Sequence, residues 1–359
     1  MKAAITASSV ISPQQTYNSD GFPPELIETI ADHLVCVEPD YRNLINPIQL
    51  RRMPRILKMG LACSQKCINR ADGVSPDAII VGTGLGCLDN LEKFLLEVLN
   101  SNEHVTSVLP FINSTHNAVA AQVAMLLKNH NYNITYCHRC FSFESALQDA
   151  MLQIEEKKAI NVLVGGIDEC TMDFMKLHGY LGYWKKSQSN LTLLSDKSSG
   201  TIAGEGSAFF MLSGEAGAGL NHIILDGVHT FFTPQKPDTA EILEEIDWML
   251  QKSGTGRDEI DGVMLGLNGD CRFDEIYYDL QKDCFADNTE FLYYKHLCGE
   301  YYTSSAFALW LGSVVIGNRH IPDALRLKGK SGHAIKNLLI YNHFRNKEHS
   351  MILLRYGQF

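Results

Sequence analysis

The sequence predicts an α/β protein in which strands and helices alternate and form layers around a buried sheet. Short apolar, β-branched runs end at glycines, as in Ala78–Val81 before Gly82 and Val162–Val164 before Gly165. Stretches with apolar residues at helical spacing lie between these runs. With 45% hydrophobic and 20% charged residues, the 359-residue chain has enough apolar material for a core. Alternation of this kind is typical of α/β layers.

The elements follow from these patterns in chain order. Strands are predicted at Ala78–Val81, Val162–Val164, Ala208–Leu212, His222–Leu225, Val263–Leu265, Leu338–Tyr341 and Met351–Leu354. Helices are predicted at Pro24–His33, Asp89–Leu99, Asn117–Leu127, Phe143–Glu156, Thr239–Lys252, Asp274–Lys282 and Ser304–Ile316. The last of these belongs to the longest apolar run, Ala306 to Gly317, which predicts a buried helix. The glycine-rich segment 214–219 is the clearest joint, so we expect two similar halves, residues 1–213 and 214–359, in one compact unit.

Charge and cysteine usage exclude several classes of protein. A balance of 31 Lys and Arg against 41 Asp and Glu gives a net charge of −10, which does not suit a nucleic-acid binder. No apolar run reaches the roughly 20 residues of a membrane span, and residues 1–15 lack the apolar stretch of a signal peptide. We therefore expect a cytoplasmic protein whose ten cysteines are reduced. Cys137 and Cys140 form a CxxC pattern, which is compatible with a redox pair or with half of a zinc site. No second pair of metal ligands accompanies them, so we expect no metal.

Two glycine motifs predict local geometry. Gly82-Thr83-Gly84-Leu85-Gly86 follows a strand and precedes a helix, but its spacing is not that of a phosphate-binding loop, so it predicts a tight turn. Gly204-Glu205-Gly206 stands just before an apolar strand. Two glycines there indicate a backbone that passes close to another segment, with Glu205 binding nearby amides.

The run from Asp196 through Gly200 to Gly204-Glu205-Gly206 resembles the signature of the β-ketoacyl synthases, the condensing enzymes of fatty-acid and polyketide synthesis. Cys140 and the later Gly165-Gly166-Ile167-Asp168-Glu169 fall at the spacing of that family's nucleophile and the strand after its helix. The resemblance covers nearly the whole chain. It implies a thiolase-like, five-layered α-β-α-β-α fold built from two similar halves. It also implies dimerisation through paired edge strands, and substrates carried as phosphopantetheine thioesters without a bound cofactor.

The sequence around Cys140 also makes this residue the candidate nucleophile, independently of the resemblance. It lies where the extended stretch Tyr132–Tyr136 gives way to the helical pattern of Phe143–Glu156. A helix N-terminus directs free amides and positive dipole at the sulfur, which lowers the pKa of a thiol. Such a thiolate takes an acyl group from a carrier thioester. Cys137 has no match in the family and is expected in the core.

The rest of the site departs from the family. Members have two histidines that stabilise the enolate formed when malonyl loses carbon dioxide; at these positions the chain has Asn268 and Glu300, while the family's Lys295 is retained. An Asn amide still donates a hydrogen bond, but an ionised Glu cannot. Glu300 would take part in the reaction only if burial kept it protonated, if it acted as a base, or if Lys295 paired with it. Phe344 matches the family's gating phenylalanine, and its neighbour His343 is a candidate for the missing imidazole.

These observations predict partners and leave three functions open. The resemblance implies that Arg51, Arg52 and Arg55 dock an acidic acyl carrier protein. We expect a homodimer, or a heterodimer with a related ketosynthase. The first function is a β-ketoacyl-ACP synthase-like acyltransferase of fatty-acid, polyketide or polyene biosynthesis, acylated on Cys140. The second is a catalytically degenerate partner subunit of chain-length-factor type, and the third is acyl transfer or thioester hydrolysis without decarboxylation.

Overall fold

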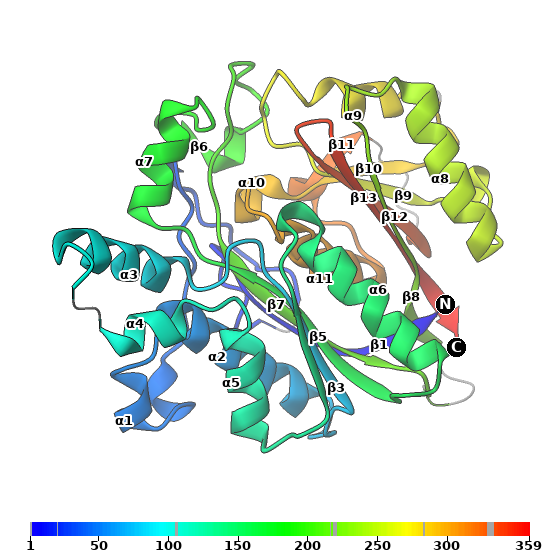
Figure 1. Ribbon diagram of the computed structural model, residues 1–359. Helices are drawn as coiled ribbons and strands as arrows, with labels where there is room; N and C mark the ends of the chain where they lie inside the picture. Colours follow the sequence, from blue (N-terminus) through cyan, green and yellow to red (C-terminus); the bar gives the residue numbers. More distant parts are fainter. Residues whose placement is uncertain are drawn as a thin grey trace.

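An eleven-stranded mixed sheet runs through the molecule (Figure 1). The structure is a computed structural model that describes residues 2–19, 21–104, 107–215, 217, 221–282, 284–328 and 334–359. The strand order is β11-β10-β9-β12-β13-β8-β1-β7-β5-β3-β4. The strands are β1 (Ala3–Ile11), β3 (Ala78–Gly82), β4 (Tyr132–Tyr136), β5 (Asn161–Asp168), β7 (Gly206–Ser213), β8 (Asn221–Phe232), β9 (Gly262–Leu265), β10 (Glu290–Tyr293), β11 (Arg326–Lys328), β12 (Asn337–Phe344) and β13 (Glu348–Gln358), with β2 (Ile30–Ala31) and β6 (Gln188–Ser189) in a separate ribbon.

The same arrangement of five strands occurs twice. In β1-β7-β5-β3-β4 the first two pairings are antiparallel and the last two parallel. The series β8-β13-β12-β9-β10 repeats this sequence of directions. A short antiparallel pairing of Ala3–Ile5 with Ile223–Leu225 joins the two series. The expected boundary after residue 213 follows the end of β7, but much of the glycine-rich joint, residues 216 and 218–220, lies outside the described residues.

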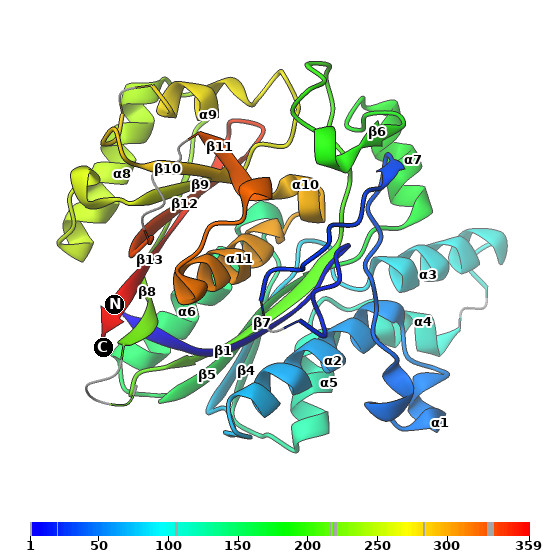
Figure 2. The ribbon, with the colours of Figure 1, turned by 180° about the vertical axis from the view of Figure 1, so that it is seen from behind.

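Helices lie outside and between the two half-sheets (Figures 1 and 2). On the first half-sheet pack α2 (Arg55–Arg70) and α5 (Ala118–Leu127), and α8 (Thr239–Ser253) packs on β8 of the second. Between them, α6 (Ser142–Glu155) and α11 (Ser304–Asn318) contact strands of both. The layers therefore alternate helix, sheet, helix, sheet, helix. The other helices are α1 (Pro47–Leu50), α3 (Leu88–Asn100), α4 (Val108–Asn113), α7 (Met172–Tyr180), α9 (Glu275–Leu280) and α10 (Lys295–Cys298).

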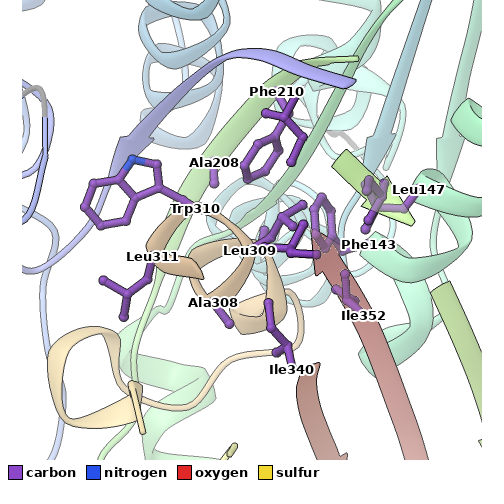
Figure 3. Close-up of a cluster of buried hydrophobic side chains, with 14 of the residues drawn as sticks. Phe143, Leu147, Ala208, Phe210, Ala308, Leu309, Trp310, Leu311, Ile340 and Ile352 are labelled. Carbon is purple, nitrogen blue, oxygen red and sulfur yellow. The ribbon is translucent and has the colours of Figure 1, made fainter. Parts of the chain in front are cut away.

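The core follows the alternation of side chains along the strands. Ile80 points into the central layer, where it shares a cluster with Phe143 of α6 and Leu309 of α11. Figure 3 shows Phe143 and Leu309 in this cluster. Its neighbour Ile79 points the other way, into the cluster that includes α2. Because α11 contacts both half-sheets, it is apolar on every side, which confirms the buried helix expected from its unbroken apolar run.

All seven predicted strands and six of the seven predicted helices are confirmed. The helix predicted at Pro24–His33 is wrong: Ile30 pairs with Ser189 in the β2–β6 ribbon, and the Leu34 amide donates to the carbonyl of Ala203. Tertiary hydrogen bonding overrides the local helical pattern there. Strand β1 was not predicted, because its alanines, serines and threonine give a weak apolar signal.

Candidate functional site

Cys140 lies at the entrance of α6. The chain makes a 3-10 turn over Arg139–Phe141 and enters the helix at Ser142. Arg139 has a φ of 47°, in the left-handed region. The Ser142 hydroxyl closes the turn by accepting from the His138 amide at 2.8 Å and donating to the Arg139 carbonyl at 2.7 Å. Cys140 is thereby directed into the molecule, with a residue exposure of 5%.

The surroundings of Cys140 reverse the predicted change in its pKa. Burial raises the pKa of the thiol well above its ordinary value, and the carboxylates of Glu348 and Glu300 add to this rise, as does Glu144 more weakly. Glu348 also accepts a hydrogen bond from the thiol. Burial and the neighbouring carboxylates outweigh the effect of the helix N-terminal dipole on the pKa of this thiol. The pKa of the Cys140 thiol is therefore raised, whereas the helix N-terminus alone predicts that it is lowered.

Asn268, Lys295 and Glu300 form one hydrogen-bonded cluster. Glu300 Oε2 accepts from Lys295 Nζ at 2.6 Å and from Asn268 Nδ2 at 2.7 Å. Lys295 has a residue exposure of 1% and Glu300 of 9%. Of the three possibilities for Glu300, the structure shows pairing with Lys295. Both donors of the cluster are thus occupied by a carboxylate of the chain itself.

The Gly204-Glu205-Gly206 motif holds Glu300 in place. The Gly204 amide donates to the Glu300 carbonyl, and the Glu300 amide donates to Ile202, both at 2.9 Å. A Cβ atom on Gly204 would lie 1.9 Å from the carbonyl oxygen of Cys298, so only glycine fits this close approach. Glu205 accepts from the amides of Cys36 and Cys170 at 2.9 and 3.1 Å. The close backbone approach and the amide-binding Glu expected from the motif are both confirmed.

Arg55 forms ion pairs with Glu205 of this motif and with Glu38. Its Nη1 donates to Glu205 Oε2 at 2.6 Å, Nη2 donates to the other oxygen of Glu205, and Nε donates to Glu38. Arg55 also lines the surface groove that contains Arg51 and Arg52, with a side-chain exposure of 31%, so its role in docking a carrier protein stays a prediction. Arg51 and Arg52 are exposed.

His343 is a buried strand residue. It stacks on Tyr277 with ring centroids 4.3 Å apart, and its Nδ1 accepts from the Asn346 amide at 3.3 Å. Burial lowers the pKa of His343 well below its ordinary value, and the neighbouring His349 and Lys295 lower it further. The imidazole is therefore neutral at physiological pH.

One pocket reaches the Asn268 and Glu300 end of this cluster. Phe344 also lines it, together with Phe174, Tyr183, Trp184, Phe273, Tyr302, Arg272 and Arg345. Among the described residues that line this pocket, Cys140, Lys295 and His343 are absent. The structure therefore brings Asn268, Glu300 and Lys295 together, while Cys140 does not line the pocket.

The glycine turn after β3 is filled by a carboxylate. Asp168 Oδ1 accepts two hydrogen bonds, one from the Gly84 amide at 2.7 Å and one from the Thr83 hydroxyl at 3.1 Å. Thr303 donates to the other oxygen of Asp168, through its amide at 2.9 Å and its hydroxyl at 2.8 Å. The predicted tight turn is confirmed, and its amides are not free for a phosphate.

Cys137 is exposed, so its expected place in the core is wrong. It follows β4, which is the edge strand of the sheet. An edge position leaves the end of that strand open to solvent.

Glu144, in the first turn of α6, gives a testable dependence on pH. Burial raises its pKa to about 7, although the Ser305 and Ser350 hydroxyls and the Lys295 charge act against the rise. The folded state holds this proton after the unfolded chain has lost it, so stability falls as pH rises from the ordinary Glu value to about 7. We expect Glu144→Gln to match the wild type in acid and to be more stable above pH 7, by up to about 3 kcal/mol.

Urea unfolding of both proteins, in acid and in mild alkali, measures this difference. Glu244→Gln, at an exposed position of α8, is the matched control and should change neither value. A gain from Glu144→Gln that is equal at both pH values would contradict the prediction, because it would not come from titration.

The chain shares its fold with known proteins. Residues 15–218 match the family model described as "Beta-ketoacyl synthase, N-terminal domain". The structure is similar to "The ishigamide ketosynthase/chain length factor" (TM-score 0.78, 16% identity, covering 100% of this chain and 99% of that one). It is also similar to the ketosynthase ApeO in complex with its chain length factor ApeC from Xenorhabdus doucetiae (0.77, 16%, 99% and 98%).

A further similar structure is "AntDE:AntF (apo)", described as a type II PKS acyl-carrier protein in complex with its ketosynthase bound to the hexaketide (0.70, 13%, 99% and 99%). No curated protein sequence matches the chain. The structural likenesses confirm the thiolase-like α/β fold class.

Proposed function

The chain belongs to the β-ketoacyl synthase family, and from this premise we propose that it is a partner subunit of a ketosynthase that does not itself catalyse decarboxylative condensation. One observation carries the proposal. Glu300 accepts from both Asn268 and Lys295, at a position where the family resemblance implies an enolate-stabilising histidine.

The chemistry of condensation explains why this arrangement favours a partner role. Loss of carbon dioxide from a malonyl thioester places negative charge on the thioester oxygen, which neutral or positive donors must stabilise. Here the two donors already bind a carboxylate, and that carboxylate would repel the developing charge. Burial and the nearby carboxylates also raise the pKa of the Cys140 thiol, and a raised pKa disfavours the nucleophilic thiolate.

A sheet edge and an apolar surface support dimerisation. Within the described residues no strand pairs with the outer edge of β4. Exposed apolar side chains lie on α5, which contacts β4, and on α3 and α4, among them Leu99, Val108 and Met125. Exposed strand edges and apolar patches of this kind mark protein interfaces. Because two of the similar structures pair a ketosynthase with a chain length factor, the partner we favour is a related ketosynthase.

An acyl carrier protein is the second partner in this proposal, delivering phosphopantetheine thioesters to the pair in the cytoplasm. The exposed Arg51 and Arg52 line a surface groove with Lys58 and Lys93. Such a basic groove in an acidic protein complements an acidic carrier. No helix in the described part of the chain could cross a membrane.

Charge reversal tests this groove. We expect Arg51→Glu/Arg52→Glu to weaken binding of the carrier protein by about tenfold at low salt, with a smaller effect at high salt, because screening removes surface attractions. Titration calorimetry at two salt concentrations measures the change. Reversal of Lys236, a lysine outside the groove, is the control. Equal affinities for the double variant and the wild type would remove this surface from the proposal.

Release of carbon dioxide from a malonyl-carrier thioester tests the main proposal. The chain alone should release none, whereas adding it to a related ketosynthase that retains cysteine and both histidines should raise condensation or change product length. Release by the chain alone, abolished in Cys140→Ala, would overturn the partner role.

Acyl transfer on Cys140 is the second candidate, favoured by the position of this residue at the entrance of α6. Intact-mass spectrometry after incubation with an acyl-carrier thioester separates the two. An adduct that is missing in Cys140→Ala, without release of carbon dioxide, would favour the transferase. No adduct on a folded protein supports the partner subunit.

A further inference from the structure

We propose that Arg345 binds the carboxylate of a planar, apolar acid in the pocket that reaches Asn268 and Glu300. This inference goes beyond the proposed function, because it assigns a small-molecule ligand to a chain that is there a partner subunit. The pocket holds about 710 Å³ of space, its open mouth included, which lies within the range of small-molecule sites. Its lining combines aromatic side chains with two arginines, Arg272 and Arg345.

Arg345 is held by aromatic rings and keeps hydrogen-bond donors to spare. Its guanidinium carbon lies 4.4 Å from the ring centroid of Tyr183 and 5.2 Å from that of Phe273, and such cation–π contacts fix its position. The guanidinium donates to the Tyr183 hydroxyl, which is its only hydrogen-bond partner among the described residues. Four of its five N–H groups are left, and a guanidinium fork matches a carboxylate with two parallel hydrogen bonds.

The charge of Arg345 has no acidic partner among the residues that the structure describes. Two carboxylates of the pocket, by contrast, have cations of their own. Asp270 accepts from Arg272 Nε at 2.8 Å, and Glu300 accepts from Lys295 at 2.6 Å. A cation without a paired acid, in a pocket partly shielded from water, is completed by an anionic group of a ligand.

The other two carboxyls of the pocket, Asp168 and Glu169, are bound by the backbone. Asp168 accepts from the Gly84 amide at 2.7 Å, and Glu169 accepts from the Asp89 amide at 3.0 Å. Burial raises the pKa of Asp168 to about 6 and that of Glu169 to about 7, so their negative charge is reduced near neutral pH. The acids that line the pocket are thus satisfied from within the chain, whereas Arg345 is not.

Aromatic rings line much of the rest of the pocket. Phe174 and His178, one turn apart on α7, have ring centroids 3.9 Å apart, and His178 meets the ring of Tyr183 edge-on at 5.0 Å. Tyr302 and Phe344, with centroids 5.7 Å apart, line it as well. Aromatic faces and edges pack favourably against a flat π-system. An aryl or conjugated carboxylic acid supplies both this body and the anion, so it is the class of ligand that the pocket fits.

Isothermal titration calorimetry of the full chain with trans-cinnamate, a planar aryl carboxylate, tests the site. We expect saturable binding to the wild type. Cinnamamide has the same flat body without the charge, and it should bind about tenfold more weakly, because charge-assisted hydrogen bonds are lost. 3-Cyclohexylpropanoate keeps the carboxylate without the flat body, and it should bind about threefold more weakly.

Variants assign the carboxylate to its arginine. Arg345→Met should weaken cinnamate binding by about tenfold and remove the difference between cinnamate and cinnamamide. Arg345→Lys keeps the charge but not the fork, so it should recover only part of the affinity. Arg52→Met, at an exposed arginine that does not line this pocket, is the control and should bind as the wild type does. The comparison of the two ligands on the wild type holds even if a variant fails to fold.

Several outcomes would overturn the site. One is equal affinity of the wild type for cinnamate and cinnamamide, and another is equal affinity of the wild type and a folded Arg345→Met for cinnamate. Absence of cinnamate binding at millimolar concentration is a third. A parallel titration with 4′-phosphopantetheine examines the other source of an oxyanion. Binding of this phosphate that depends on Arg345, without binding of cinnamate, would assign the arginine to the carrier arm and overturn the planar acid.

The titrations require neither a carrier protein nor a ketosynthase, so their failure is distinguishable from failure of the proposed function. Cinnamate binding by a chain that releases no carbon dioxide from malonyl-carrier supports both. Cinnamate binding together with release supports the site and overturns the partner role. Absence of both overturns the site alone.

Discussion

Replacing Arg55 with methionine is expected to lower the free energy of unfolding by about 3–5 kcal/mol, the loss typical of a buried ion pair that is deprived of one partner. The side chain of Glu205 is fully buried, with 0% exposure. Burial by itself would raise its pKa, yet the hydrogen bonds and charge of Arg55 keep that pKa below the ordinary value. Without Arg55, Glu205 would keep only two amide donors for a buried charge.

Urea unfolding measures the loss, with Arg52→Met, at an exposed position, as the control. Because the folded-state pKa of Glu205 is depressed, the contribution of the pair is full above the ordinary Glu pKa and disappears as pH falls through the folded-state value. The difference between wild type and Arg55→Met should therefore shrink in acid. The double variant Arg55→Met/Glu205→Gln should recover part of the loss, since no buried charge remains. Equal stability of Arg55→Met and wild type would contradict the role given to the pair.

Replacing Gly204 with alanine is expected to destabilise the protein by about 3 kcal/mol or more, at the upper end of what overpacking costs. The new Cβ would lie 1.9 Å from the carbonyl oxygen of Cys298 and 2.7 Å from the Cα of Gly299. Both are backbone atoms, so no side-chain rotation relieves the clash. They also directly precede Glu300, and their displacement should loosen its contacts with Lys295 and Asn268.

Thermal unfolding compares this variant with Gly357→Ala, a matched substitution in β13 where no atom lies within 4 Å of the added Cβ. Gly357→Ala should leave the unfolding temperature unchanged. A Gly204→Ala protein as stable as the wild type would show that the two segments separate without penalty.

The sequence by itself determined the features that depend on local spacing. Glycine-bounded apolar runs located the strands, and the unbroken apolar run 306–317 identified the central helix. Gly204-Glu205-Gly206 indicated a close backbone approach and a Glu that binds amides, because both follow from which side chains are present and absent. The entrance of α6 at Cys140 likewise followed from a change of periodicity.

Tertiary structure decided which groups meet. Arg55 and Glu205 are 150 residues apart in the chain, so no local pattern assigned the arginine to its buried partner. Hydrogen bonds to neighbouring segments, and not its own helical periodicity, determine the conformation of the Pro24–His33 segment. Cys137 is exposed and follows β4, whose position at the edge of the sheet is defined only by the order of the strands.

The pKa of Cys140 shows the same division most clearly. Its position before a helix was local information and predicted a lowered pKa. Burial and the carboxylates of Glu348, Glu300 and Glu144, of which the first two come from distant parts of the chain, raise it instead. Electrostatic interactions depend on distance through space and on the exclusion of water. Neither quantity exists in a sequence until the chain has folded.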